Sequence, residues 1–295
     1  MVLRQATHAG SWYPGSKSSL TKALKEYFID QDFGPGEEPQ SLNNKERKII
    51  GGVSPHAGMA YSGPCAAFTY LNLFKEKIPD VVIILGTDHI GYHKTALMKK
   101  GEWETPLGNL KIDEELSKMI IDNSKIIEED NTLFTGFQAE QEHNIEIQLP
   151  FIKYCSQDRD VKIVTIKIAG VREFNVMDEI SKDIAEIIEV TDKDIVVVAS
   201  SDMSHKQVDN AQQLEVFKKI DLEVIEEFQG LHPEKTLEAA KKTTICGPQT
   251  ITTLLLICKR LNATKGELLK YYTSSERTGS NRGYCVGYFS GILVK

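Results

Sequence analysis

Three apolar segments of the chain each end, within a few residues, in a histidine. The segments are residues 49–56, 81–89 and 195–205, and their histidines are His56, His89 and His205. Short runs rich in Val and Ile and bounded by Gly, Pro and Ser are typical of strands buried on both faces, as in parallel sheets covered by helices. The carboxyl ends of such strands lie at one edge of the sheet, where open α/β folds bind ligands. We therefore predict that these histidines converge on one site together with Asp202.

The residues around His56 suit a bound metal or substrate. Pro55 stiffens the backbone before it, and Ala57 and Gly58 leave space after it. A single histidine of this kind is usually an ordinary residue of a surface loop. The same placement of His89 favours a binding or catalytic site instead.

Asp202 and His205 are three residues apart and could perform acid–base chemistry. The carboxylate could orient the imidazole, or one of the two could act as a general acid or base. The alternative for Asp202 is a helix N-cap. Ser200 and Ser201 also place hydroxyl groups at this strand end, which core packing does not require, and this favours the functional interpretation.

His143 and Glu146 lie in a segment predicted to be helical, with a spacing that places both on one helical face. Such pairs also occur by chance on helix surfaces, so the spacing alone does not decide whether either residue belongs to a functional site. His93 and His232 follow no comparable pattern, and we predict that they are surface residues.

Cys246 precedes Gly247 and Pro248 at the predicted start of a helix. The helix dipole and free N–H groups there would lower the thiol pKa and favour the thiolate, which attacks carbonyls or binds metals. A buried, unreactive thiol is the alternative. The chain has five cysteines, scattered without a C-x-x-C pair, so neither a disulfide framework nor a thiolate zinc knuckle is indicated.

Alternating helices and strands must position these residues. Strands are predicted to begin at Ile49 and Val81 and to cover residues 161–168, 195–199 and 284–294. Helices are predicted over residues 20–28, 64–74 (opened by Pro64), 143–154, 174–189, 210–228, 233–242 and 247–261, and from Asp113 onward. This order predicts an α/β fold with a central, mostly parallel or mixed sheet flanked by helices. Residues 93–112 suggest a hairpin. The loop at residues 31–47 does not divide the chain, so we expect a single domain over residues 1–295.

Composition narrows the function classes. The chain has 295 residues, 41% of them hydrophobic, which is enough for a full core. The net charge is −7, without a Lys/Arg cluster, and this argues against nucleic acids and anionic membranes as partners. The first residues lack an apolar signal core and the longest apolar runs are too short to span a bilayer, so we predict a cytoplasmic protein.

Six ordered motifs resemble those of the Memo family, including its archaeal and bacterial members. They lie at residues 8–14, 55–63, 85–89, 142–146, 200–205 and 244–247. The resemblance covers nearly the whole chain and implies a fold similar to that of the class III extradiol dioxygenases. It also implies a site that resembles the site of non-haem iron enzymes but has been altered. It also implies AMMECR-type and radical SAM proteins as partners.

By this resemblance His56, His89 and Cys246 would bind a metal. The other pocket residues that the resemblance implies are Asp202, His205 and His143 in supporting or acid–base roles, and Trp12 and Tyr61 as ligand contacts. The dioxygenase-like site uses two histidines and a carboxylate, whereas this chain has Cys246 at the third position. Thiolate is softer than carboxylate and widens the choice of metal to copper, iron or zinc.

Three functions are consistent with these residues. The first is an iron- or copper-dependent redox enzyme acting on an unknown small molecule, in which His205 moves protons. The second is a module that binds a phosphorylated or acidic peptide, with Trp12 and Tyr61 at the rim; since no Arg stands beside the motifs, imidazolium groups would have to supply the positive charge. The third is a hydrolase with Cys246 as nucleophile and His205 as base, which leaves the other two histidines without a role. We rank them in this order.

Overall fold

A computed structural model describes residues 2–170, 173–280 and 282–295. Its largest sheet has nine strands in the order β10-β12-β2-β9-β3-β8-β4-β7, with β11 also paired to β12. The strands are β2 (Ile49–Ser54), β3 (Val81–Thr87), β4 (Ala96–Leu97), β7 (Glu128–Glu129), β8 (Lys162–Ile168), β9 (Ile195–Ser200), β10 (His205–Val208), β11 (Lys265–Thr273) and β12 (Gly283–Val294). The four central strands β2, β9, β3 and β8 are parallel, and β12 joins β2 antiparallel. The predicted mixed sheet is confirmed.

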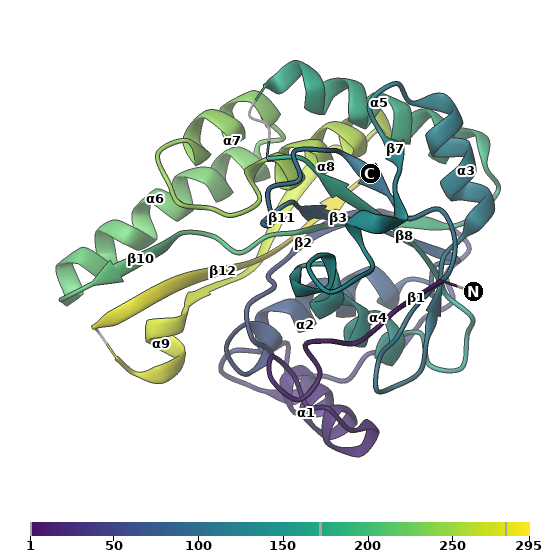
Figure 1. The fold of residues 1–295 in the computed structure, drawn as a ribbon. Coiled ribbons are helices and arrows are strands. Elements are labelled where there is room, and N and C mark those ends of the chain that lie inside the picture. Colours follow the sequence, from purple (N-terminus) through teal and green to yellow (C-terminus); the bar gives the residue numbers. More distant parts are fainter. Residues whose placement is uncertain (1, 171–172, 281) are drawn as a thin grey trace.

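Helices cover both faces of this sheet (Figure 1). The helices are α1 (Lys17–Ile29), α2 (Met59–Lys75), α3 (Glu114–Asn123), α4 (Leu149–Cys155), α5 (Phe174–Val190), α6 (Ala211–Gln229), α7 (Pro233–Ala240), α8 (Pro248–Arg260) and α9 (Ser274–Thr278), with 3₁₀ turns η1 (Asn131–Leu133), η2 (Ala139–Gln141) and η3 (Glu146–Gln148). Alternate strand residues face opposite sides, so Ile83 and Leu85 of β3 pack with α3, α5, α6, α7 and α8. Val82 and Ile84 pack with α1, α2 and α4 on the other side.

The predicted parallel unit around α2 is present, but its two strands are not neighbours. β9 lies between β2 and β3 and pairs with both. The carboxyl ends of these three strands therefore lie side by side at one edge of the sheet. The loops that follow them carry His56, His89 and Asp202, and His205 is the first residue of β10.

The prediction that Pro64 opens the helix after β2 is wrong. α2 begins at Met59, and Pro64 lies inside it. Proline lacks the N–H that would bond to the carbonyl four residues earlier, which is that of Ala60. Arg277 Nε donates to this carbonyl instead, at 3.5 Å, and this contact partly replaces the missing bond.

The predicted hairpin in residues 93–112 is present as β5 (Glu102–Trp103) and β6 (Leu110–Lys111), which pair antiparallel. With β1 (Leu3–Arg4) they form a separate three-stranded sheet. β11 and α9 were not predicted from the sequence. For β11 the reason is that its residues do not alternate clearly between buried and exposed positions.

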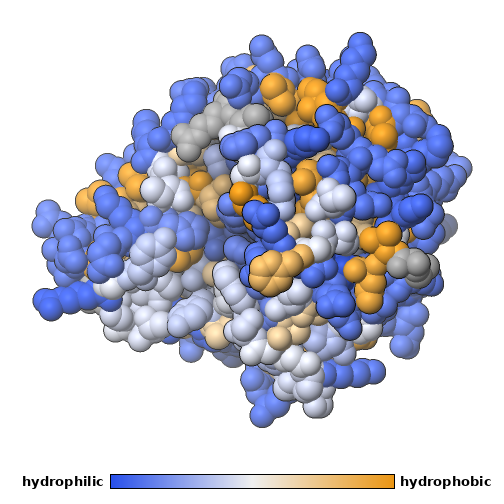
Figure 2. All heavy atoms as spheres, viewed as in Figure 1, coloured by the Kyte–Doolittle hydropathy of each residue, from blue (hydrophilic) through white to orange (hydrophobic). Residues whose placement is uncertain are grey.

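The face of the molecule drawn in Figure 2 is mostly hydrophilic, and its hydrophobic residues lie in small separate groups. Such scattered groups are ordinary for a protein surface. None of the helices in the described part of the chain is long and apolar enough to cross a membrane.

Candidate metal centre

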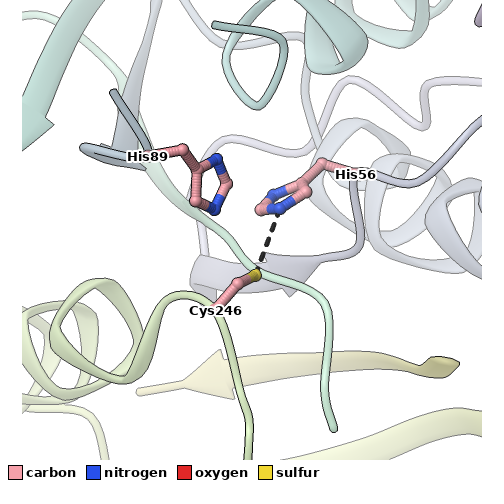
Figure 3. Close-up of side chains that lie close together, drawn as sticks. All are labelled: His56, His89 and Cys246. Carbon is pink, nitrogen blue, oxygen red and sulfur yellow. Dashed lines mark hydrogen bonds between the residues drawn. The ribbon is translucent and has the colours of Figure 1, made fainter. Parts of the chain in front are cut away.

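The histidines that follow β2 and β3 meet as predicted. The ring centroids of His56 and His89 are 5.4 Å apart. Cys246, in the loop before α8, joins them, with its Sγ 3.2 Å from Nε2 of His56 (Figure 3). One donor atom from each of the three residues lies within 4.8 Å of the others. Residues far apart in the sequence therefore present two nitrogens and one sulfur to the same point.

A buried hydroxyl group orients His56. Its Nδ1 lies 3.0 Å from Oγ of Ser200. The single proton of that hydroxyl is donated to the Asn144 carbonyl at 2.7 Å, so the oxygen can only accept from the imidazole. Nδ1 of His56 therefore carries the proton, and the lone pair of Nε2 faces Cys246. This is the tautomer that binds a metal through Nε2.

A carboxylate orients His89 in the same way. Nδ1 of His89 is 2.9 Å from Oε1 of Glu142, and the backbone N–H of His89 donates to Oε2 at 2.8 Å. Burial raises the pKa of Glu142, but the hydrogen bonds and charge of His89 outweigh it and lower the pKa to about 2. The group is thus a carboxylate, which only accepts, so Nδ1 of His89 donates to it and Nε2 is the nitrogen left to face the other donors.

His143 completes a cluster of three imidazoles. Its ring centroid is 5.3 Å from that of His56 and 5.3 Å from that of His89, and the Trp12 ring lies 4.1 Å from it. Burial, with the neighbouring imidazoles, lowers the pKa of His56 to about 3 and that of His143 to about 4. Both rings are neutral near pH 7. They can bind a cation there, and they do not supply the imidazolium charge that the peptide-binding hypothesis requires.

The expected pairing of His143 and Glu146 on one helical face is wrong. The helix expected from His143 begins only at Leu149 as α4, after the turn η3. His143 faces the other imidazoles, whereas Glu146 is buried and bonds to Nδ1 of His8 at 2.9 Å. The residue before His143, Glu142, is the one that contacts the site. The motif at residues 142–146 includes Glu142, but the sequence did not single it out, because its partner His89 comes from another loop.

Cys246 occupies the predicted position before α8, but the predicted effect on its thiol is wrong. Burial and the nearby Asp202 raise the pKa of the thiol, and the helix start does not reverse this. The thiol lies near the Asp202 carbonyl, at 3.5 Å, and near Ser201 Oγ, at 3.7 Å. A bound metal ion would supply the positive charge that stabilises the thiolate.

Asp202 and His205 form a charged pair beside the three donors. Oδ1 of Asp202 accepts from the backbone N–H of His56 at 2.7 Å and from that of Ala57 at 3.2 Å, so Asp202 is not a helix cap. Its Oδ2 is 3.7 Å from Nε2 of His205, and Nδ1 of His205 faces the Thr244 carbonyl at 3.3 Å. Burial lowers the pKa of His205, but Asp202 outweighs it and raises the pKa. This histidine can hold a proton next to the site.

These side chains line a cavity of about 560 Å³. Its lining includes Trp12 and Tyr61, the two predicted ligand contacts, together with all six predicted metal-binding and acid–base residues. It also includes a residue that sequence reasoning missed, Arg282, in the segment before β12. His93 is exposed, and His232 pairs with Glu227 elsewhere.

The family model described as Memo-like protein matches residues 4–292. The chain belongs to the Memo-like family. MEMO1 family proteins of Desulfurococcus amylolyticus and Pyrococcus furiosus are each 36% identical to it, with at least 98% of both chains covered. That of Saccharolobus solfataricus is 38% identical over 96% of both chains. An Escherichia coli K12 structure, titled as an uncharacterized protein, superimposes with a TM-score of 0.45 at 12% identity, covering 81% of this chain and 99% of the other. The resemblance of the six motifs to the Memo family is thereby confirmed.

Proposed function

We propose that this Memo-like protein binds iron or copper through His56, His89 and Cys246 and performs redox chemistry on a small molecule in the cavity. The observation that carries the proposal is the orientation of the donors. Ser200 and Glu142 hold the outer nitrogens of the two imidazoles, which leaves the Nε2 atoms for an ion shared with the thiol. Imidazole and thiolate together suit copper, iron and zinc.

The donor set fits a single ion. The three donor atoms lie within 4.8 Å of one another, and metal bonds to nitrogen and sulfur are about 2.0 to 2.3 Å long. Three protein ligands would leave coordination positions for a substrate, and the metal would supply a centre that changes oxidation state. Zinc would occupy the same donors without redox activity.

The residues of the chain around the donors have separate tasks in this proposal. Glu142 keeps His89 in the metal-binding tautomer. Asp202 favours the protonated form of His205, so this imidazole can deliver a proton to a group bound in the cavity. The ring of Trp12 lies against His143 and covers one side of the cluster.

Metal analysis of protein purified without oxygen tests the proposal. We expect iron or copper in the native chain and its loss in Cys246→Ser and His89→Ala. Matched controls are Cys285→Ala, a buried thiol elsewhere, and His232→Ala, an imidazole bound to Glu227. Equal metal contents in all five proteins would contradict it. Oxygen uptake with a panel of catechols then separates redox chemistry from metal storage.

A second candidate function is the binding of an acidic or phosphorylated peptide in the same cavity. Arg282 favours it, because this side chain lines the cavity and supplies the positive charge that the neutral imidazoles do not. Titration with a phosphotyrosine peptide and its unphosphorylated form tests it. The hydrolase is not supported, since the raised thiol pKa of Cys246 disfavours a nucleophilic thiolate.

A further inference from the structure

One wall of the cavity comes from the last part of the chain. It consists of α9, the flanking residues Ser280 and Arg282, and the beginning of β12, and its lining residues are Ser274, Ser275, Thr278, Ser280, Arg282 and Tyr284. Tyr284 is 66% exposed, whereas His56 and Asp202 are each only 2% exposed. The cavity therefore has a deep end at His56 and Asp202, beside the more exposed His89, and an entrance at this wall, where Arg282 is also exposed.

The guanidinium group of Arg282 has no partner among the residues that the structure describes. Four other arginines are paired with carboxylates, in the bridges Arg4–Glu146, Arg47–Asp194, Arg260–Asp178 and Arg277–Asp30. The backbone of Arg282 is nevertheless held. Ser280 Oγ accepts its N–H at 3.3 Å and donates to its carbonyl at 2.8 Å. The loop thus fixes where the side chain starts and leaves its charged end available.

The charges that line the cavity do not cancel near its entrance. The lining contains no lysine, and its carboxylate is that of Asp202. That carboxylate is already used at the deep end by the backbone of His56 and by His205. An uncompensated guanidinium at the entrance of a cavity favours an anionic ligand, because its planar N–H groups match the two oxygens of a carboxylate.

We propose that Arg282 binds the carboxylate of a small ligand whose other end reaches the metal donors. One guanidinium balances the single charge of a carboxylate, whereas the two charges of a phosphate monoester would find no second unpaired cation in the described lining. A cavity of about 560 Å³ has the size of a small-molecule site. Tyr284, whose ring lies 6.3 Å from that of His205, would flank the ligand. This inference rests on the proposed function, because the metal ion proposed there would hold the other end of the ligand.

A pair of probes of equal shape tests the inference. 3,4-Dihydroxybenzoate and 3,4-dihydroxybenzamide both carry a catechol that can bind a metal, but only the first is charged. Their dissociation constants are measured by calorimetry without oxygen, on zinc-loaded and on metal-free protein, so that no turnover is required. Phenyl phosphate is a third probe. Metal binding is measured separately, and its absence would contradict the proposed function rather than this inference.

We expect the native chain to bind the benzoate about ten- to a hundred-fold more tightly than the benzamide, as a charge-assisted hydrogen bond would give. Arg282→Gln should abolish the preference, and Arg282→Lys should keep part of it. Arg159→Gln is the matched control, since Arg159 also lacks an ion pair among the described residues but lines a different depression. Its preference should be unchanged.

Several outcomes would overturn the inference. For the native chain, these are equal affinity for the two catechols or no measurable benzoate binding at millimolar concentration. For the variants, they are a benzoate preference that survives in Arg282→Gln or one that is lost equally in Arg159→Gln. Tighter binding of phenyl phosphate than of the benzoate would instead assign Arg282 to a phosphorylated ligand.

Discussion

The two ends of the cavity are built in opposite ways. At the deep end, Ser200 and Glu142 hold the outer nitrogens of the two imidazoles, and these donors point toward Cys246 before any ion binds. At the entrance, Arg282 is exposed and unpaired within the described chain. Chemistry requires fixed donor geometry, whereas recognition requires a group that remains free until the ligand arrives. In the proposed function, these two tasks would thus fall to different parts of the chain.

The deep end also has a second layer of buried contacts. Oε2 of Glu146 lies 3.0 Å from Arg4 and 2.9 Å from His8, and Oε1 accepts from the Tyr13 hydroxyl at 2.7 Å. Arg4 in turn donates to the Glu142 carbonyl at 3.0 Å. The N-terminal segment therefore stabilises the loop that carries the carboxylate behind His89. The entrance wall also has ion pairs, Lys218–Glu276 and Arg277–Asp30, but their side chains are partly exposed, whereas those of Arg4 and Glu146 are buried.

The largest effect should come from breaking this buried network. Glu146→Ala removes a fully buried carboxylate and leaves the guanidinium of Arg4 unpaired, so the free energy of unfolding should fall by about 3 to 5 kcal/mol. Urea unfolding measures it. Lys22→Ala, which removes an exposed pair with Glu26, is the control and should cost less than about 1 kcal/mol. Equal losses would mean that the deep end has no special rigidity.

Removal of the charge behind His89 should weaken metal binding without unfolding the protein. Glu142→Gln keeps the size of the side chain but loses the carboxylate that fixes the tautomer, and metal affinity should fall about ten- to a hundred-fold. Competition with a coloured chelator measures the affinity. Glu140→Gln, on the preceding turn, is the control. An unchanged affinity would show that the backbone alone orients His89.

A smaller effect should come from Asp221, which supports the loop between Asp202 and His205. This buried carboxyl accepts from the Ser204 N–H at 3.1 Å and from the Tyr271 hydroxyl at 2.9 Å, and burial raises its pKa to about 6. The folded state therefore binds more protons than the unfolded state between pH 4 and pH 6, and its stability falls as the pH rises through this window. Asp221→Asn removes this dependence.

The stability of Asp221→Asn relative to the native chain should thus increase by about 1 to 2 kcal/mol between pH 4 and pH 7. Unfolding curves at four pH values measure the difference, in which the contributions of other groups cancel. A difference that stays constant with pH would show that this carboxyl is ionised in the folded state as easily as in the unfolded one.

The smallest effect is expected at the entrance. Arg282 is exposed and unpaired among the described residues, so Arg282→Gln should change the free energy of unfolding by less than about 0.5 kcal/mol. Thermal unfolding of the two proteins, both free of metal, measures it. A loss as large as that of Glu146→Ala would place Arg282 in the structural framework and end the contrast between the two ends.

Sequence patterns predicted much of the deep end. Runs of Val and Ile that end in His56 and His89 indicated parallel strands, and the rule that their carboxyl ends share an edge predicted the convergence of the two histidines. The Gly-Pro helix start after Cys246 was also predicted correctly. These features depend on local residue order and on general topology, which a sequence displays directly.

The tertiary structure alone decided what surrounds each group. Glu142 contacts His89 across 53 residues, and Arg282 reaches the cavity from a loop that no motif marks. The thiol pKa of Cys246 is raised by burial and Asp202, although its place before a helix suggested the opposite. Hydrogen-bond partners, burial and unpaired charge depend on which distant segments pack together. The sequence by itself thus determined where the strand-end histidines lie, and the packing determined their hydrogen-bond partners, orientation and exposure.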